Sequence, residues 1–197
     1  MSQLTFIFAA MNAGKSTLLL QAAHNYVERG MAVELYTAAL DTRAGLGVIR
    51  SRLGIERGAS TFNADTVFDH RILERDTACL LIDESQFLRP VQVRQLHRLA
   101  HTSQVPIRCY GLRSDFLGHP FAGSAALLTL ADEFEEVRAV CGCGKKATMN
   151  ARLDATGARV SAGEQTLIGG NERYIAMCPR CFYLDSAGEQ DAQSTAA

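Results

Sequence analysis

A lysine and a hydroxyl residue near the start of the chain stand in a pattern that could hold a triphosphate. Gly14, Lys15 and Ser16 fall within the stretch AAMNAGKST, which follows the apolar run Leu4–Phe8. A short strand, a small-residue loop ending in Gly-Lys-Ser and then a helix are typical of a phosphate-binding loop. The backbone N–H groups and the helix dipole favour an anion there, the lysine contacts the terminal phosphates, and the serine hydroxyl coordinates Mg²⁺. We therefore assign nucleotide binding to Ala9, Ala10, Met11, Asn12, Ala13, Gly14, Lys15, Ser16 and Thr17.

The first position of this loop is usually glycine, and here it is Ala9. An alanine favours negative φ, so we expect Ala9 to have an ordinary backbone conformation. The alternative interpretation is a turn with a glycine at a helix end and a surface lysine. That alternative leaves the order of strand, loop and helix unexplained.

Two neighbouring carboxylates follow a second apolar run, in the sequence CLLIDE that ends at Asp83 and Glu84. An acidic residue at the end of such a strand holds the Mg²⁺ that the loop serine also contacts. Side chains alternate along an extended backbone, so Asp83 and Glu84 should point in different directions. We expect Asp83 to serve the metal and Glu84 to act as a general base, a role worth ~10²–10⁴-fold in rate. Two solvated acids at a turn are the alternative.

Four of the six cysteines form two close pairs, Cys141 with Cys143 and Cys178 with Cys181. Four thiolates from two tight turns satisfy a tetrahedral Zn²⁺ and leave no open position, so this zinc should be structural. A redox pair or free thiols are the alternatives. Residues 144–177 leave the metal and return to it, which suggests a tethered lid over a small ligand. The two remaining cysteines lie in apolar runs and are expected to be buried.

The composition limits the classes of function. The chain has 197 residues, 47% of them hydrophobic, enough for one full core and a small appendage. Its net charge is −1, with 20 basic and 21 acidic residues and no basic block, which argues against a nucleic-acid-coating surface. No apolar run approaches the ~18 residues that span a bilayer, and no basic leader begins the chain. We expect a cytoplasmic protein without membrane or nucleic-acid partners.

Apolar periodicity predicts strands that alternate with helices, and hence an α/β fold with a parallel sheet covered on both faces. The strands are expected at Leu4–Phe8, Ala32–Thr37, Cys79–Asp83, Pro106–Gly111 and Glu135–Val140. The helices are expected at Ser16–Arg29, Asp69–Arg75, Val91–His101 and Phe121–Thr129. Residues 41–60, rich in glycine and arginine, are predicted to be a mobile loop whose arginines could reach phosphate. The domains are expected at 1–140, 141–183 and, as a disordered tail, 184–197.

Together these motifs resemble the type II thymidine kinases, the zinc-containing phosphate-loop deoxynucleoside kinases. Beside AAMNAGKST, the matching segments are DTR at 41–43, DESQF at 83–87, GLRSDFLGHPF at 111–121 and IGGNERY at 168–174. Their order and spacing hold from Leu4 to Cys181. The resemblance implies a RecA-like phosphate-loop sheet with a small C-terminal zinc-binding lasso domain.

The resemblance also implies an activity: ATP-dependent phosphorylation of the thymidine 5′-hydroxyl to dTMP for DNA synthesis, with Mg²⁺ and bound Zn²⁺. It further implies a homotetramer and dTTP as a feedback inhibitor. Glu84 would be the base, and Arg43, Asp83 and Gln86 would join the loop around the nucleotide. The thymidine pocket would comprise Met11, Phe87, Leu112, Phe116, Phe121, Ile168, Gly169, Gly170, Asn171 and Tyr174. Simple core packing is the alternative for each aromatic residue.

Two other classes of function remain open from the residues alone. A nucleic-acid-dependent ATPase would use the zinc segment as a grip and would show strongly salt-dependent binding. A non-catalytic zinc-stabilised interaction module would make Lys15 and Glu84 incidental.

Overall fold

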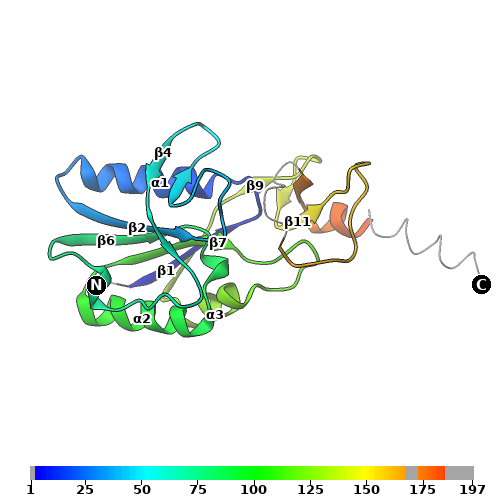
Figure 1. Cartoon of the computed structure of the whole chain (residues 1–197). Helices are drawn as coiled ribbons and strands as arrows, with labels where there is room; N and C mark the ends of the chain where they lie inside the picture. The colour runs from blue at the N-terminus through cyan, green and yellow to red at the C-terminus, as the bar shows by residue number, and fades with distance from the viewer. Residues whose placement is uncertain (1–2, 167–172, 185–197) are drawn as a thin grey trace, which may run out of the picture.

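A six-stranded parallel sheet forms the body of the protein (Figure 1). The computed structural model describes residues 3–166 and 173–184. The strands lie in the order β5-β2-β6-β7-β1-β8, and each pairs in parallel with its neighbours. Their bounds are β1 (Leu4–Ala9), β2 (Ala32–Ala38), β5 (Ser60–Phe62), β6 (Thr77–Ile82), β7 (Ile107–Leu112) and β8 (Glu133–Glu136).

Three α-helices cover the two faces of this sheet. Figure 1 shows α1 (Lys15–Val27) on one face and α2 (Pro90–Ser103) with α3 (Ala122–Leu130) on the other. The first turn of α2 begins with Pro90, where the missing N–H costs no helical hydrogen bond. This arrangement confirms the predicted α/β class.

Each face of the sheet has its own apolar core. On the α1 side, Leu19 and Leu20 of the helix pack with residues of β1, β2, β6 and β7. On the opposite side, Val93 and Leu96 of α2 pack with Phe6 and Leu80. Because both faces are covered, the central strands β1, β6 and β7 are almost continuously buried, as parallel strands are.

Glycines allow a tight contact around the short 3₁₀ helix η2 (Ser85–Phe87) that follows β6. A Cβ on Gly111 of β7 would lie 2.6 Å from Ser85 Oγ, and one on Gly123 of α3 would lie 2.5 Å from Leu88 O. The residues of η2 are therefore fixed against β7 and α3, close to the carboxyl end of the sheet.

The structure corrects three of the predicted elements. The helix predicted at 69–75 is only the 3₁₀ turn η1 (His70–Ile72), because Leu73 is already extended. The strand predicted at 135–140 is two strands, β8 and β9 (Ala139–Val140), since β8 pairs with β1 and β1 ends at Ala9.

The third correction concerns residues 41–60, predicted as a mobile loop. They include the antiparallel hairpin of β3 (Val48–Arg50) and β4 (Glu56–Gly58) and the first residue of β5. Ile49 is 2% exposed and packs with the core beneath α1, so a single apolar side chain anchors the hairpin.

A smaller region, residues 139–166 and 173–184, lies beyond the carboxyl ends of the central strands (Figure 1). It holds two antiparallel pairs, β9 with β10 (Lys146–Ala147) and β11 (Met149–Arg152) with β12 (Tyr174–Met177), and residues 179–184 are helical. The predicted tail from residue 184 therefore overlaps this helix by one residue, and 185–197 lie outside the described residues. Within the described ranges, every helix is too short or too polar to cross a membrane.

Candidate functional site

The predicted phosphate loop joins β1 to α1. Ala9 ends β1 with a negative φ, as expected. The loop turns at Asn12 and Gly14, whose φ angles are 65° and 86°, and α1 begins at Lys15. Of the side chains that the structure describes, none caps the start of α1. The first-turn N–H groups therefore remain available to an anion.

The lysine of the loop is buried and bonds within the loop. Lys15 Nζ donates to the Ala10 carbonyl at 3.2 Å, inside its own loop. Burial lowers the pKa of Lys15, against the opposing effect of the Glu84 and Asp83 carboxylates. A phosphate partner would therefore stabilise the charged form of this buried lysine.

The loop serine and the first acid of the pair touch. Ser16 Oγ donates to Asp83 Oδ2 at 2.8 Å, and Asp83 is only 5% exposed. Burial and the neighbouring Glu84 charge raise the pKa of Asp83. A hydroxyl and a buried carboxylate side by side are oxygen ligands suited to Mg²⁺.

The second acid of the pair makes different contacts, as predicted, but strand alternation is not the cause, because β6 ends at Ile82. Glu84 has a left-handed backbone, φ 53°, and its carboxylate forms an ion pair with Arg43. Arg43 is held in turn by Asp41, with Nε–Oδ1 at 2.5 Å. Gln86 donates to Glu84 at 2.5 Å and accepts from the Leu112 N–H at 3.1 Å. The Glu84 carboxylate is therefore oriented from two sides.

Two cavities meet at this carboxylate. A large groove runs along the phosphate loop from Asn12 to Leu18, past Asp83, to the hairpin at residues 48–54. A smaller cavity lies between η2, the loop after β7 and the β11–β12 pair. Both are lined by Met11, Asp41, Arg43, Glu84 and Leu112. A group transferred from one cavity to the other would pass Glu84 and Arg43.

The smaller cavity has an apolar, aromatic wall. Phe87 and Phe121 meet edge to face, with ring centroids 6.0 Å apart. The residues predicted for a nucleoside pocket that line it are Met11, Phe87, Leu112, Phe116, Phe121 and Tyr174. Gln86 also lines this cavity, although we assigned it to the nucleotide. Ile168, Gly169, Gly170 and Asn171 lie outside the described residues.

Ala9 and Ala10, assigned to the nucleotide as part of the loop, are buried at 5% and 4% exposure. The rest of the loop, from Met11 to Thr17, and Arg43 line the groove. The two alanines therefore contribute backbone and packing, and the polar residues after them face the groove.

Asn150 of β11 is a site residue that the sequence analysis missed. It is 2% exposed, accepts from the Met11 N–H at 2.7 Å and donates to the Ser114 carbonyl at 2.9 Å. Asn12 Nδ2 also donates to the Tyr174 carbonyl at 3.2 Å. The β11–β12 pair is thus bonded directly to the phosphate loop. A lone polar residue in the strand sequence MNAR gives no signal of such a contact.

Asp115 and Gln165 are further missed residues of the smaller cavity. Asp115 Oδ1 accepts from the N–H groups of Leu117 and His119 at 2.9 and 2.8 Å, and its Oδ2 accepts from Gln165 at 3.0 Å. The buried carboxylate therefore shapes the loop after β7 and ties residue 165 to it. The sequence feature that could have identified Asp115 as a site residue is its position in the motif GLRSDF.

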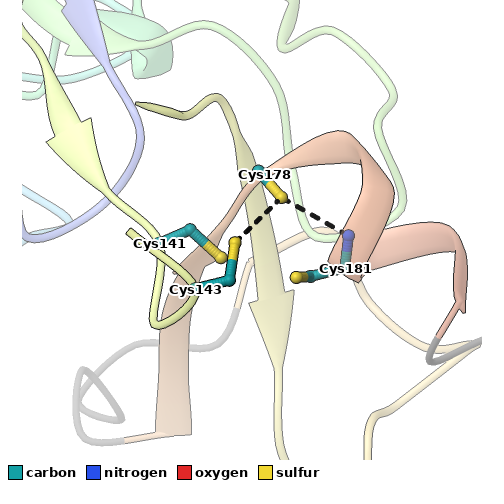
Figure 2. A group of neighbouring side chains, drawn as sticks. All are labelled: Cys141, Cys143, Cys178 and Cys181. Atoms are coloured by element: carbon teal, nitrogen blue, oxygen red, sulfur yellow. Dashed lines mark hydrogen bonds between the residues drawn. The ribbon is translucent and has the colours of Figure 1, made fainter. Parts of the chain in front are cut away.

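The four predicted zinc ligands come together (Figure 2). Their sulfur atoms all lie within 4.8 Å of one another, with Cys143 Sγ 3.6 Å from Cys178 Sγ. A tetrahedral ion with Zn–S bonds of about 2.3 Å requires sulfurs roughly 3.8 Å apart. Backbone N–H groups of Cys143 and Cys178 lower the pKa of Cys141, whereas hydrogen bonds with the neighbouring cysteines raise that of Cys181. The cluster therefore fits a structural Zn²⁺.

This cysteine cluster packs against the phosphate loop. Cys141 and Cys178 share a small apolar cluster with Ala139, Ala147 and, from the loop, Ala10. Ala13 packs against the same cluster. The loop is therefore held between the central sheet and the cysteine-bearing region, and its alanines supply methyl groups to that contact.

A phosphate loop after the first strand of a parallel sheet, with an acid pair at the end of a nearby strand, defines the class of phosphate-loop nucleotide-binding proteins. The comparisons with known proteins narrow the class. The sequence model of the family described as "Thymidine kinase" matches residues 2–182. The chain belongs to the thymidine kinase family.

Curated relatives agree over nearly the whole chain. A protein of Chromobacterium violaceum named thymidine kinase is 54% identical over 186 residues, covering 94% of this chain and all of the relative. A thymidine kinase of Novosphingobium aromaticivorans is 55% identical, covering 92% of this chain and 97% of the relative. One of Ruegeria pomeroyi is 50% identical over 197 residues, covering 98% and 99%.

Proposed function

We propose that the protein transfers the γ-phosphate of ATP to the 5′-hydroxyl of thymidine, giving dTMP and ADP. The observation that carries this proposal is the junction of the two cavities. Glu84 and Arg43 line both the groove along the phosphate loop and the smaller aromatic cavity. A triphosphate in the groove and a neutral nucleoside in the cavity would meet beside the Glu84 carboxylate and the Arg43 guanidinium.

Glu84 is the proposed general base. As the 5′-oxygen of thymidine attacks the γ-phosphorus, its proton passes to the Glu84 carboxylate and the bond to the bridging oxygen of ADP breaks. Gln86 and Arg43 orient that carboxylate through the hydrogen bonds described above. Phosphoryl transfer needs little beyond alignment and charge compensation, which such fixed groups supply.

Lys15 and the N–H groups at the start of α1 are proposed to hold the β- and γ-phosphates. Ser16 and Asp83 would hold Mg²⁺, which neutralises charge on the phosphate oxygens. Their 2.8 Å contact fits two ligands of a single small ion. Arg43 lines the groove while it is held by Asp41 and Glu84, and it is proposed to contact the phosphates from that position.

The aromatic cavity is the proposed thymidine pocket. A neutral nucleoside needs apolar walls and a few directed polar groups. Phe87, Phe121 and Tyr174 supply walls, and the polar groups Asn150, Asp115 and Gln165 stand beside them. We extend this pocket to the predicted residues 168–171, whose main chain would hold the base.

The four cysteines are proposed to bind a structural Zn²⁺ that folds the region carrying this wall. We accordingly propose a nucleotide-binding domain at 1–140, a zinc-binding lasso domain at 141–183 and a tail at 184–197. From the family resemblance we propose in addition a cytoplasmic homotetramer that serves DNA synthesis and is inhibited by dTTP. Light scattering measures the assembly, and assays with added dTTP measure the inhibition.

The test uses radiolabelled ATP with a panel of nucleosides, with and without DNA. We expect label in dTMP when thymidine is present and little transfer to purine nucleosides. ADP release stimulated by DNA would instead indicate a nucleic-acid-dependent ATPase. No transfer and no ADP release would indicate a non-catalytic zinc module, and either result would overturn the proposal.

A further inference from the structure

A second group of metal-ligating side chains lies away from the cysteine cluster and from both cavities. It consists of His97 and His101, one turn apart on α2, and Asp132, between α3 and β8. One ligand atom from each lies within 4.8 Å of the other two. Since Asp132 bonds to Leu4 at the start of β1, this group is at the end of the sheet opposite to the phosphate loop.

The distances suit a common ion. His101 Nε2 lies 3.2 Å from Asp132 Oδ2, and His97 Nε2 lies 3.7 Å from Asp132 Oδ1. Zinc bonds to nitrogen and oxygen of about 2.0–2.2 Å place the ligand atoms of a tetrahedral ion roughly 3.3–3.6 Å apart. Small side-chain rotations would bring all three ligand atoms within bonding distance of a single ion.

The carboxylate is held in place by the backbone. The Leu4 N–H donates to Asp132 Oδ2 at 2.8 Å, and the Asp132 N–H donates to the Leu4 carbonyl at 2.9 Å. An ionised carboxylate with an outer hydrogen bond is a typical oriented metal ligand.

The two imidazoles are also arranged for shared coordination. Their ring centroids are 4.7 Å apart with planes at 70°, and their side chains are 35% and 46% exposed. An ion can therefore enter from solvent. His97 and His101 are residues i and i+4 and so lie on the same side of α2. The helix therefore fixes the distance between their two rings.

We propose that His97, His101 and Asp132 form a second metal site that binds one divalent transition-metal ion, Zn²⁺ or Ni²⁺. Imidazole nitrogen suits these borderline ions better than Mg²⁺ or Ca²⁺. Three protein ligands leave the remaining positions to water. The ion links α2 to the start of β1 and β8. The site is independent of the proposed kinase activity.

The test is calorimetric titration of Ni²⁺ into the zinc-loaded protein, with the bound zinc measured before and after. We expect one added equivalent per chain, and at least tenfold weaker binding for His101→Ala and Asp132→Asn. His24→Ala is the matched control, because His24 faces Glu28 at 3.1 Å on α1 in a two-residue pair that belongs to neither metal-ligand group of the described chain. The metal-free melting temperature of each variant verifies folding.

A second measurement needs no substitution. Cu²⁺ bound to the unmodified protein should show paramagnetic resonance coupling to two imidazole nitrogens. The proposal is overturned if no added equivalent binds, if His101→Ala binds as tightly as the unmodified protein, or if the copper signal shows fewer than two nitrogens.

Discussion

The nucleotide site has two ends, the phosphate loop and the cysteine-bearing region, and these are built in different ways. The phosphate loop leaves a strand that is buried between two parallel neighbours, in a sheet with a core on each face. The cysteine-bearing region consists of two short antiparallel pairs and one small apolar cluster. The first region is stabilised by its packing, whereas the second has too little apolar surface to be stabilised in the same way. A metal is the natural source of its stability.

The comparison also shows that the two ends depend on each other. Ala10 of the loop shares an apolar cluster with Cys141 and Cys178, and the Met11 N–H is bonded to Asn150. Loss of the metal should therefore disturb the phosphate loop as well as the aromatic cavity. Four substitutions separate these effects.

The largest effect is expected for Cys178→Ser. Without the fourth thiolate, zinc content should fall to near zero, and phosphoryl transfer should fall to background because the wall carrying Tyr174 and Asn150 loses its support. Elemental analysis and the kinase assay measure both. Cys109→Ala, which removes a fully buried thiol from the sheet, is the control and should keep its zinc. Undiminished zinc in Cys178→Ser would refute the four-thiolate site.

Glu84→Gln tests the proton-transfer step alone. We expect kcat to fall by about 10²–10⁴-fold, because the amide cannot accept the proton from the 5′-hydroxyl. Affinity for Mg·ATP and zinc content should be unchanged. Steady-state kinetics and nucleotide titration provide the measurements, with Glu133→Gln, on the exposed edge strand, as the control. Near-normal turnover would remove Glu84 from the mechanism.

Asn150→Ala tests the connection between the two ends. Removing a buried hydrogen-bond partner costs roughly 1–3 kcal/mol, because the Met11 N–H and the Ser114 carbonyl lose their partner. We expect KM for ATP to rise about tenfold with zinc content unchanged. Asn25→Ala, which removes an exposed side-chain bond on α1, should leave KM unaltered. An unchanged KM for ATP in Asn150→Ala would mean that the connection does not position the loop.

The smallest effect is expected for Ala10→Gly. The substitution removes a methyl group from the cluster shared with the cysteines and frees the backbone, which together should cost about 1 kcal/mol of unfolding free energy. Urea denaturation measures the loss. Ala64→Gly, at an exposed position, should cost less. Equal losses in both variants would show that the contact between the loop and the cluster adds no stability.

The same contrast explains what could be predicted from the sequence. The phosphate loop and the acid pair are local patterns fixed by strand ends, so Lys15, Ser16 and Asp83 were found by type and spacing. The cysteine pairs were found because thiolate spacing is also local. Asn150 was missed because its role depends on a long-range contact with the Met11 N–H, and no local pattern around residue 150 indicates that contact. The hairpin anchored by Ile49 was missed because one buried side chain outweighs a glycine-rich composition.

The central claim is that a phosphate groove and a nucleoside cavity are separate sites that meet at Glu84. The most direct test is calorimetric titration of the zinc-loaded protein with a non-hydrolysable Mg·ATP analogue, followed by thymidine. We predict one equivalent of each ligand bound at the same time on every chain. No binding of the analogue at millimolar concentration, or thymidine that binds only when the analogue is absent, would contradict the claim.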